Sequence, residues 1–371
     1  MKILYFYPEE KDNFMYFWQR VHFIDELSRN GIEVEILNPL DFNSLEESHE
    51  ALLRQVCKQK YDLFFTSASL FINNEILSQI KQKSIPTLCF RPDNLLIPYI
   101  DKEIAASFDL IWLTSKETEH LYKKWGANYI FLPYAANPYT FQPKYATKIN
   151  KICFIGTPYG SRSNMINTLI NHGIMVDVFC KNQERKNTIP VETRYKKPSM
   201  STLDVLMNDL RFKEGRKVLI ANLKNRIQSH SLNEESINLT LLPKVPFESL
   251  TGIYSNYSLS LSSSSARHTD ILTTPVPVVN LRAFEIPMSG GLQFCRYNEE
   301  LANYFIDNKE IVFYKDSEEM VDKASFYLNE KNEKLISQMK MAARNKAESD
   351  HTWIKRFNKV FEILGLNCLN K

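Results

Sequence analysis

Short apolar runs alternate with amphipathic segments through most of this chain. In the first third, runs such as KILYFYP (2–8), YDLFFTSASLF (61–71) and IPTLCFRPD (85–93) are separated by segments with helical spacing of apolar residues, such as 14–31, 45–59 and 74–83. An apolar run without polar alternation is typical of a strand buried on both faces. The pattern therefore predicts an α/β fold in which helices cover both faces of a parallel sheet.

The same alternation restarts after a polar, proline-bearing segment, 138–150. A chain of 371 residues is longer than one typical domain. We therefore expect two doubly wound Rossmann-like domains that face each other across a cleft. The expected domains are 1–140 and 150–350, with an insertion at about 181–237 in the second, and an amphipathic helix at 351–366 that packs back on the first.

Composition excludes several classes of protein. The net charge is +3, from 46 basic and 43 acidic residues, which gives no general signal for nucleic acid. The first residues lack the organisation of a cleavable signal peptide, and no run is long and apolar enough to span a bilayer. The six cysteines are scattered without a CxxC pair, which indicates reduced thiols and a cytoplasmic location.

A short predicted helix near residue 285 places a cation and an acid side by side. Arg282 and Glu285 are three residues apart, so they are neighbours on one helical face. We expect Asn280 to cap this helix, Pro287 to shorten it, and the glycines at 290–291 to end it. Such a pair can hold a sugar nucleotide, with the guanidinium on the diphosphate and the carboxylate on ribose hydroxyls. The alternative is an ordinary surface ion pair.

Several segments in order resemble one known group, the spore-maturation-type (CgeB-like) glycosyltransferases of the GT-B fold. The matching segments are LPYAANPYTFQP, ICFIGTPYGSRSNMINTLINHG, LPKVPFESLTGIYSNYSLSLS, LRAFEIPMSGGLQF, NEELANYFIDNKEIVFYKDSEEMVDKASFYL and HTWIKRF. They cover most of residues 128–360 except the insertion. Before them, the chain is similar only in its alternation of strands and helices.

The resemblance implies a donor site in the second domain and an acceptor site in the first. The expected donor-binding residues are Gly156, Thr157, Arg162, Arg282 and Glu285. Glu285 corresponds in position to the carboxylate that binds donor ribose in related enzymes. The arginines would meet the diphosphate of a UDP- or GDP-linked sugar, and the turn before Arg162 would add backbone N–H donors. Arg162 could instead cap or pair on a helix surface.

One position departs from the pattern of many retaining GT-B enzymes. Those enzymes carry a Glu–x7–Glu motif that ends at the ribose-binding carboxylate, and here the earlier position is Pro277. The sugar and the stereochemical outcome therefore stay open. No DxD triplet occurs, so we expect neither a metal-bound diphosphate nor any cofactor.

The residue that would take the acceptor proton is less constrained. His22 and Asp93 are ranked equally, because histidine is a common base and Asp93 follows a predicted strand where α/β sheets bind ligands. His22 could also be packed, and Asp93 could simply form a turn. The acids Glu9, Glu10 and Asp12 are further alternatives, and His268 and Asp270 lie in a loop that either contacts the donor or is solvated.

The sequence thus predicts a metal-independent hexosyltransferase-like enzyme of polysaccharide biosynthesis. It would move a sugar from a nucleotide diphosphate sugar to a hydroxyl of a glycan, a lipid-linked acceptor or a protein. A sugar-nucleotide epimerase and a catalytically silent sugar-nucleotide-binding protein are the alternatives. The basic stretch 181–197 is either a solvated loop or a peripheral contact with anionic lipid at the inner face of a membrane.

Overall fold

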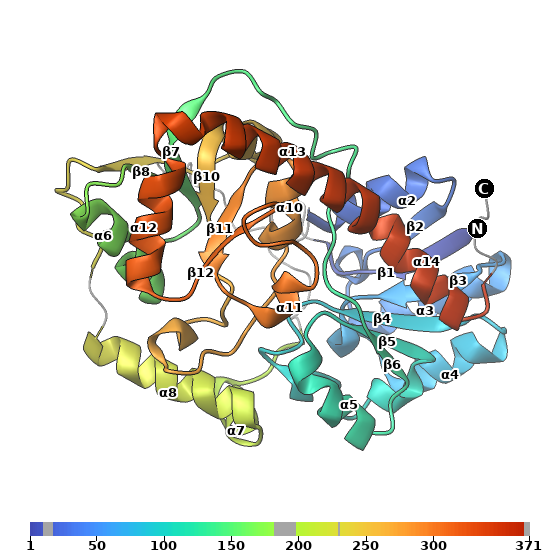
Figure 1. The fold of residues 1–371 in the computed structure, drawn as a ribbon. Coiled ribbons are helices and arrows are strands. Elements are labelled where there is room, and N and C mark those ends of the chain that lie inside the picture. The colour runs from blue at the N-terminus through green and yellow to red at the C-terminus, as the bar shows by residue number, and fades with distance from the viewer. Residues whose placement is uncertain (10–17, 182–197, 229–230, 367–371) are drawn as a thin grey trace. The chain divides into compact units, whose positions relative to one another are not determined.

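The computed structural model describes residues 1–9, 18–181, 198–228 and 231–366, and it divides into two compact units (Figure 1). Unit 1 comprises Met1–Pro133, Ile189–Gly215 and Trp353–Lys371. Unit 2 comprises Tyr134–Thr188 and Arg216–Thr352. Each unit contains its own six-stranded sheet, so the predicted pair of α/β domains is confirmed.

The sheet of unit 1 has the order β2-β1-β3-β4-β5-β6, and its strand pairs are all parallel. Its strands are β1 (Lys2–Phe6), β2 (Glu33–Leu37), β3 (Leu63–Thr66), β4 (Thr87–Arg91), β5 (Leu110–Leu113) and β6 (Tyr129–Phe131). The chain runs outward from β1 to β2 and then returns to the other side of β1 through β3. This order is that of a doubly wound sheet.

Helices cover both faces of this sheet. The longer ones are α2 (Asp25–Arg29), α3 (Leu45–Lys58), α4 (Asn74–Gln82), α5 (Glu119–Lys124), α7 (Thr202–Leu210) and α14 (Trp353–Ile363). The shorter turns are η1 (Arg20–Ile24), η2 (Pro39–Asp41), η3 (Ser69–Phe71), η4 (Pro98–Asp101), η5 (Ala105–Ser107) and η6 (Lys116–Thr118). Ser44 and Asn73 cap α3 and α4 by accepting backbone N–H groups of the first turn.

Alternate residues of β1 serve the two faces. Leu4 and Phe6 pack in a core with α3 and α4, whereas Tyr5 lies in a cluster of aromatic rings on the opposite face. That second cluster joins neighbouring strands to η1 and α14 through Phe65, Phe90, Trp112, Phe23, Trp353 and Phe357. The buried Glu26 accepts the Trp353 and Ile354 backbone N–H groups at 3.1 and 2.9 Å, which stabilises the start of α14.

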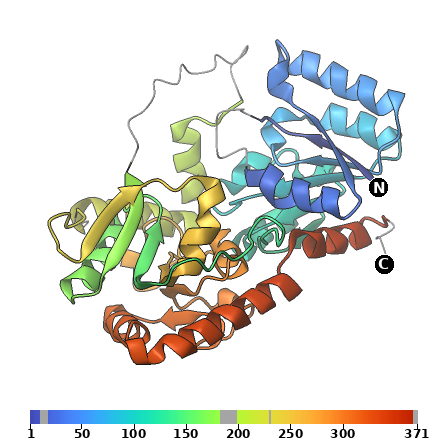
Figure 2. The ribbon, with the colours of Figure 1, turned by 90° about the horizontal axis from the view of Figure 1, so that it is seen from above.

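The sheet of unit 2 has the order β12-β11-β10-β7-β8-β9 and is also parallel (Figures 1 and 2). Its strands are β7 (Ile149–Ile155), β8 (Val176–Lys181), β9 (Leu239–Pro243), β10 (Tyr257–Leu261), β11 (Gln293–Arg296) and β12 (Val312–Tyr314). Its helices are α6 (Ser161–Asn171), α8 (Lys213–Gln228), α9 (Leu250–Asn256), α10 (Arg282–Met288), α11 (Glu299–Ala302), α12 (Ser317–Tyr327) and α13 (Glu333–Asp350), with the turns η7 (Phe247–Ser249), η8 (Thr269–Ile271) and η9 (Glu330–Asn332).

The long helix α13 holds two shorter helices of unit 2 in place. Lys340 donates to the carbonyl oxygens of Ser255, at 2.9 Å, and Tyr257, at the end of α9. Arg344 donates to the carbonyl of Met288, the last residue of α10. Cations at helix C-termini satisfy carbonyls that have no partner within the helix.

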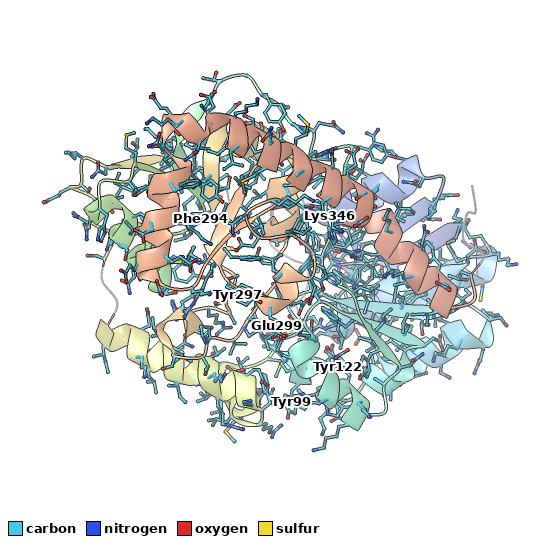
Figure 3. All side chains as sticks on the ribbon, in the orientation of Figure 1. Tyr99, Tyr122, Phe294, Tyr297, Glu299 and Lys346 are labelled. Carbon is cyan, nitrogen blue, oxygen red and sulfur yellow. The ribbon has the colours of Figure 1, made fainter. Side chains whose placement is uncertain are left out.

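Most predicted elements are present, with three differences. The run 61–71, predicted as one strand, is β3 followed by the turn η3. The insertion is divided: its described residues up to Gly215 belong to unit 1, because Arg211 and Phe212 pack on Tyr99 beside α5 (Figure 3). The helix predicted over 14–31 is described only from residue 18. The basic stretch after Lys181 lies outside the described residues.

No helix among the described residues is long and apolar enough to cross a membrane.

Candidate functional site

The strand order of unit 2 predicts where a ligand binds along one edge of its sheet, the edge formed by the carboxyl ends of the strands. From β7 the chain moves outward to β8 and β9, and it then returns to the other side of β7 with β10. The segments that follow β7 and β10 therefore diverge at the carboxyl ends of these two adjacent strands. Open α/β sheets bind ligands at such a crossing point. The residues that follow β7 and β10 include those predicted to bind a donor.

The segment after β7 is a tight turn that leads into α6. Gly156 and Gly160 have φ values of +144° and +58°, a region that favours glycine. Gly160 precedes the first residue of α6, and a Cβ there would lie 2.3 Å from His268 Nδ1. Thr157 is exposed between the two glycines. The turn thus presents the positive end of an eleven-residue helix at this edge of the sheet.

Arg162 lies in the first turn of α6 and is half-buried. Its guanidinium lies over the ring of Tyr159, 4.7 Å from the ring centre, which fixes the side chain on one side. Burial lowers the pKa of Arg162 from its ordinary value, and the charge of Arg282 adds to this effect. Two cations therefore lie close enough to repel each other.

Arg282 and Glu285 lie at the start of α10. Arg282 Nη2 is 3.8 Å from the position that a Cβ on Gly156 would take, so the turn after β7 and α10 approach each other closely. Glu285 is buried, with 7% of its surface exposed. Burial acts to lower the pKa of Arg282, but the neighbouring Tyr254 and Glu285 raise it above its ordinary value.

The surroundings of the two arginines contain no close acidic partner in the part of the chain that the structure describes. Among the described residues, no carboxylate oxygen lies within 4.0 Å of either guanidinium. Asp270 and Glu285 influence them electrostatically from farther away. Two partly buried guanidinium groups of this kind are suited to an anion with several oxygens, since each can donate two parallel hydrogen bonds.

The loop after β10 closes the other side of this group. The His268 ring packs edge-on against Tyr159 at 5.4 Å, and its Nδ1 has no hydrogen-bond partner in the described part of the chain. Burial lowers the pKa of His268, and Arg162 and Arg267 lower it further. Asp270 accepts from the Ser161 and Ser263 hydroxyls at 3.5 and 3.4 Å. The loop predicted as either a donor contact or a solvated segment therefore packs on the start of α6.

A pocket of about 410 Å³ adjoins the same turn. Tyr159 and Gly160 line it, together with Ser163, Cys180 and Leu241. Arg162, Arg282 and Glu285 do not line it. It is therefore adjacent to the candidate donor site but separate from the arginines.

The helix α10 differs from its prediction in one detail. Asn280 does not cap it: the helix follows Leu281, and the Asn280 amide instead donates to the Ser263 carbonyl at 2.7 Å. That bond ties the loop after β10 to α10. The glycine end is confirmed, because Gly290 takes a φ of +71° and its N–H donates to the Pro287 carbonyl.

The predicted base candidates lie in unit 1 and differ sharply. His22 is fully buried, and its Nδ1 accepts from the Trp353 indole N–H at 3.1 Å. Its ring packs among aromatic side chains, so it anchors α14 and does not face a substrate. The geometry opposes the base role for His22. Among the acids, Glu9 pairs with Arg20, and Glu10 and Asp12 lie outside the described residues.

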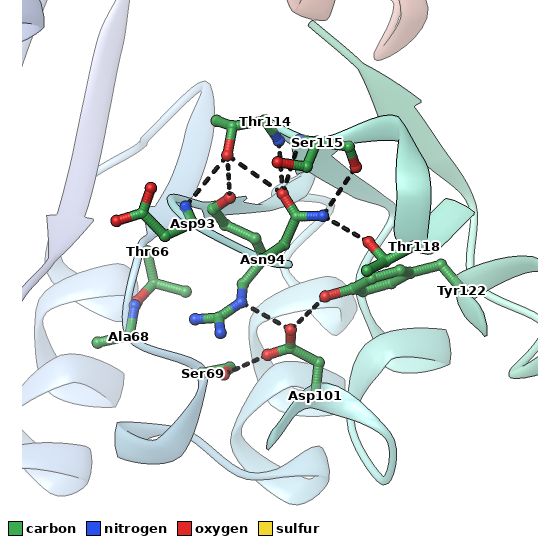
Figure 4. A network of polar contacts seen from close by, with 11 residues as sticks. Thr66, Ala68, Ser69, Asp93, Asn94, Asp101, Thr114, Ser115, Thr118 and Tyr122 are labelled. Atoms are coloured by element: carbon green, nitrogen blue, oxygen red, sulfur yellow. Dashed lines mark hydrogen bonds and ion pairs between the residues drawn. The ribbon is translucent and has the colours of Figure 1, made fainter. Parts of the chain in front are cut away.

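Asp93 is exposed beyond the carboxyl end of β4 (Figure 4). It has a φ of +50°, and its backbone N–H donates to Thr114 Oγ1 at 3.1 Å. The next residue, Asn94, is fully buried and accepts the N–H groups of Thr114 and Ser115. Asp93 is thus held by a rigid turn with its carboxylate outward, although β4 is not at the crossing point of its sheet, which lies between β1 and β3.

A buried ion pair lies beneath that turn. Arg91 Nε is 2.6 Å from Asp101 Oδ2, and Asp101 also accepts from Tyr122 and Ser69, both at 2.5 Å (Figure 4). Asp101 is fully buried, and 7% of the Arg91 side chain is exposed. The acid ties η4 to α5 and η3, so the group is well placed to stabilise the local structure.

The structure therefore gathers Gly156, Arg162, Arg282 and Glu285 in unit 2, with Thr157 exposed beside them. Sequence reasoning missed Tyr159 and Tyr254, which flank the two arginines. Tyr159 is three residues before Arg162, and that spacing was an available signal. Tyr254 comes from α9, and nothing in the sequence distinguishes it from an ordinary core aromatic residue.

Comparison with known proteins tests the predicted fold and the predicted enzyme class. Residues 212–362 match the family described as "Glycosyl transferase-like". No curated protein matches the chain. The chain is similar in structure to Anabaena HepE, at 10% identity with a TM-score of 0.57, and to sucrose-phosphate synthase from Thermosynechococcus elongatus, at 13% with a TM-score of 0.55. Both similarities cover 98% of this chain and 99% of the other. The fold is GT-B.

The GT-B fold was predicted, and the prediction is confirmed. A trehalose-6-phosphate synthase is also similar, at 10% identity with a TM-score of 0.53, covering 98% of this chain and 99% of the other. The family match and the fold together support the predicted enzyme class, a glycosyltransferase. The narrower spore-maturation-type family is not identified by these matches and stays a prediction.

Proposed function

We propose that this GT-B protein transfers a sugar from a nucleotide diphosphate sugar to a hydroxyl group. The observation that carries the proposal is that Arg162 and Arg282 both lie at the turn after β7, at the crossing point of the second sheet, and that no carboxylate of the described residues lies within 4.0 Å of either guanidinium. A diphosphate supplies the negative charge that this arrangement lacks. HepE, which shares the fold, has been solved with UDP, with UDP and glucose, and with UDP-glucose.

Each residue has a role in this proposal. Arg162 and Arg282 stabilise the charge that develops on the leaving diphosphate, and both stay protonated at neutral pH. The absence of a side chain at Gly156 allows the diphosphate to approach the backbone, and Thr157 lies within the same turn. Glu285 accepts from ribose hydroxyls. The start of α6 adds its positive dipole end.

The acceptor lies with unit 1 in this proposal. Of the two equally ranked candidates for the base, Asp93 is the one we propose, since His22 is buried and its Nδ1 is engaged by Trp353. The acceptor is a hydroxyl of a glycan, a lipid-linked molecule or a protein, and the donor carries UDP or GDP. Metal independence, the cytoplasmic location and a role in polysaccharide biosynthesis stay predictions. Activity that survives a chelator would support the first of them.

The decisive experiment measures donor binding. Calorimetry with UDP- and GDP-linked sugars should identify a ligand, and Arg162→Ala, Arg282→Ala and Glu285→Ala should weaken it. Loss of a charge-assisted hydrogen bond costs about 1.5–3 kcal/mol, or about 10- to 100-fold in affinity. Arg54→Ala, which removes an exposed arginine of α3, is the matched control. Unchanged affinity in both arginine variants would remove this site.

Product analysis then separates transfer from other uses of the same site. Release of nucleoside diphosphate that depends on an added acceptor supports the transferase. Conversion of the donor to an epimer without any acceptor would show that the protein is an epimerase and not a transferase. Asp93→Asn should lower the turnover rate while donor affinity is retained, because its proposed role is to accept the acceptor proton.

A further inference from the structure

The helix α7 exposes its apolar residues and buries its polar ones. Leu203, Leu206, Met207 and Leu210 occupy one face at helical spacing, and all four are exposed, Leu203 to 67%. On the opposite side, Asn208 and Asp209 are buried. This is the reverse of the usual arrangement of a surface helix, in which the apolar stripe faces the core.

The next helix, α8, also exposes an apolar stripe. Ile220, Leu223 and Ile227 follow one another at helical spacing, and Leu223 and Ile227 are 62% and 86% exposed. Val218 and Ala221 are the buried residues of this helix that pack against the protein. The exposed stripe is therefore additional to the apolar contact that holds α8 in place.

Basic residues border the stripe of α8. Lys213 lies seven residues before Ile220, and Lys224 lies four residues after it. Arg226 lies three residues after Leu223. All three basic side chains are exposed. The only acid of α8, Glu214, is more buried than these residues. A central apolar strip flanked by cations is the composition of helices that bind at the surface of anionic membranes.

This concentration is unusual for the molecule. Seven of the seventeen large apolar side chains that are exposed in the described part of the chain belong to α7 and α8. Exposed apolar groups gathered in this way indicate an interaction surface, whereas single ones need no explanation. α7 belongs to unit 1 and most of α8 to unit 2, so the two stripes are separate observations: α7 contributes apolar side chains only, and α8 contributes both apolar side chains and cations.

We propose that the exposed apolar stripes of α7 and α8 dock this protein on an anionic lipid surface. The leucine, isoleucine and methionine side chains enter the boundary between headgroups and acyl chains, and the basic residues of α8 contact the negative headgroups. A second copy of the chain is a poorer occupant, because a symmetric contact through α8 would bring like charges together. The proposal does not depend on the donor site.

The test uses the full chain and vesicles of phosphatidylcholine with or without phosphatidylglycerol. Co-sedimentation should show binding to the anionic vesicles that is strong at low salt and weakens as salt is added. Lys213→Gln with Lys224→Gln should reduce that binding about 25-fold, since each lysine near an anionic surface contributes about fivefold. Leu206→Ser with Leu210→Ser should reduce it about tenfold or more, because two exposed leucines lose their apolar contact.

Matched controls come from α13, which has comparable exposed residues. Met341→Ser with Lys334→Gln removes one exposed apolar and one exposed basic side chain and should leave vesicle binding unchanged. All variants should keep the circular dichroism spectrum and the thermal midpoint of the unaltered protein, which shows that they are folded and keeps this test independent of the donor site. Three results would overturn the proposal. The protein could bind neutral and anionic vesicles equally, or the α7 and α8 variants could bind anionic vesicles as well as the unaltered protein does. The third is a protein oligomer that binds no vesicles and that the leucine substitutions dissociate.

Discussion

The polar groups at the carboxyl ends of the two sheets are arranged in opposite ways. In unit 1, Arg91 has Asp101 at 2.6 Å, and that acid is also held by Tyr122 and Ser69. In unit 2, Arg162 and Arg282 lie near each other, and no described carboxylate is within 4.0 Å of them. Arg91, which is buried and paired with Asp101, stabilises the local structure. Arg162 and Arg282, which have no described carboxylate within 4.0 Å, are suited to bind an anionic ligand. The difference favours unit 2 as the unit that would bind an anion.

The largest expected effect tests the structural half of this comparison. Asp101→Asn keeps the shape of the side chain but leaves the buried Arg91 without a negative partner. We expect the free energy of unfolding of unit 1 to fall by about 3–5 kcal/mol. All four tryptophans, Trp18, Trp112, Trp125 and Trp353, belong to unit 1, so urea denaturation followed by tryptophan fluorescence reports this unit alone.

A matched control for Asp101→Asn is Asp350→Asn. Asp350 pairs with Lys346 one turn away on α13, where Asp350 is exposed and Lys346 is half-buried, and such a surface pair is worth less than about 1 kcal/mol. Donor affinity should be unchanged in both variants. Equal stability of the Asp101 variant and the unaltered protein would show that the Arg91 pair does not stabilise unit 1.

The next prediction concerns the ligand-binding half. Arg282→Gln should weaken donor binding by about 1.5–3 kcal/mol. Without ligand, it should lower the midpoint of thermal unfolding only slightly, because the lost attraction to Glu285 and Tyr254 is partly offset by the relief of repulsion with Arg162. Calorimetry and circular dichroism measure the two quantities. A marked loss of stability together with unchanged donor affinity would show that Arg282, like Arg91, stabilises the fold and does not bind the donor.

Periodicity in the sequence was sufficient for the fold. Apolar runs such as 2–8 and 85–93 became the parallel strands β1 and β4, and the glycines at 290–291 ended α10 as predicted. The donor residues Gly156 and Arg162 could be grouped because they follow one strand closely. Their approach to Arg282 and Glu285 was implied only by the resemblance to GT-B enzymes.

Contacts between distant residues could not be predicted in this way. His22 meets Trp353 across 331 positions, and neither local sequence shows that the imidazole will be enclosed. Tyr254 lies beside Arg282 only because α9 and α10 pack together. The helix α7 shows a further limit: its spacing predicts a helix with an apolar stripe, but spacing alone does not say that the stripe faces solvent.

A smaller effect tests the geometry of the turn after β7. Gly160→Ala should weaken donor binding about 5- to 30-fold, since a Cβ there meets His268 Nδ1 at 2.3 Å and the φ of +58° disfavours other residues, which together cost about 1–2 kcal/mol. Gly173→Ala is the control, because Gly173 has a φ of +79° but no atom within 4 Å of the added Cβ. It shares the backbone strain without the contact. Equal donor affinities for the two variants would mean that the contact with His268 does not matter to the site.

The smallest expected effect concerns the uptake of a proton by His268 when the donor binds. In the free protein, burial and the cations Arg162 and Arg267 hold the pKa of His268 below its ordinary value of 6.5, with Asp270 as the opposing charge. A bound diphosphate would favour the protonated imidazole and raise this pKa, so binding takes up a proton between the two values. Donor affinity should therefore rise about two- to threefold as pH falls through that window and stay constant above it.

A nucleotide sugar is the right ligand for this measurement, because its diphosphate has no ionisation of its own near pH 6. Calorimetry at pH 6 in buffers of different ionisation enthalpy gives the number of protons taken up. His268→Gln should abolish the uptake, whereas His172→Gln, which changes an exposed histidine at the end of α6, should preserve it. Proton uptake that persists in the His268 variant would place the diphosphate away from this loop, and only the two arginines and α6 would then remain as its binding groups.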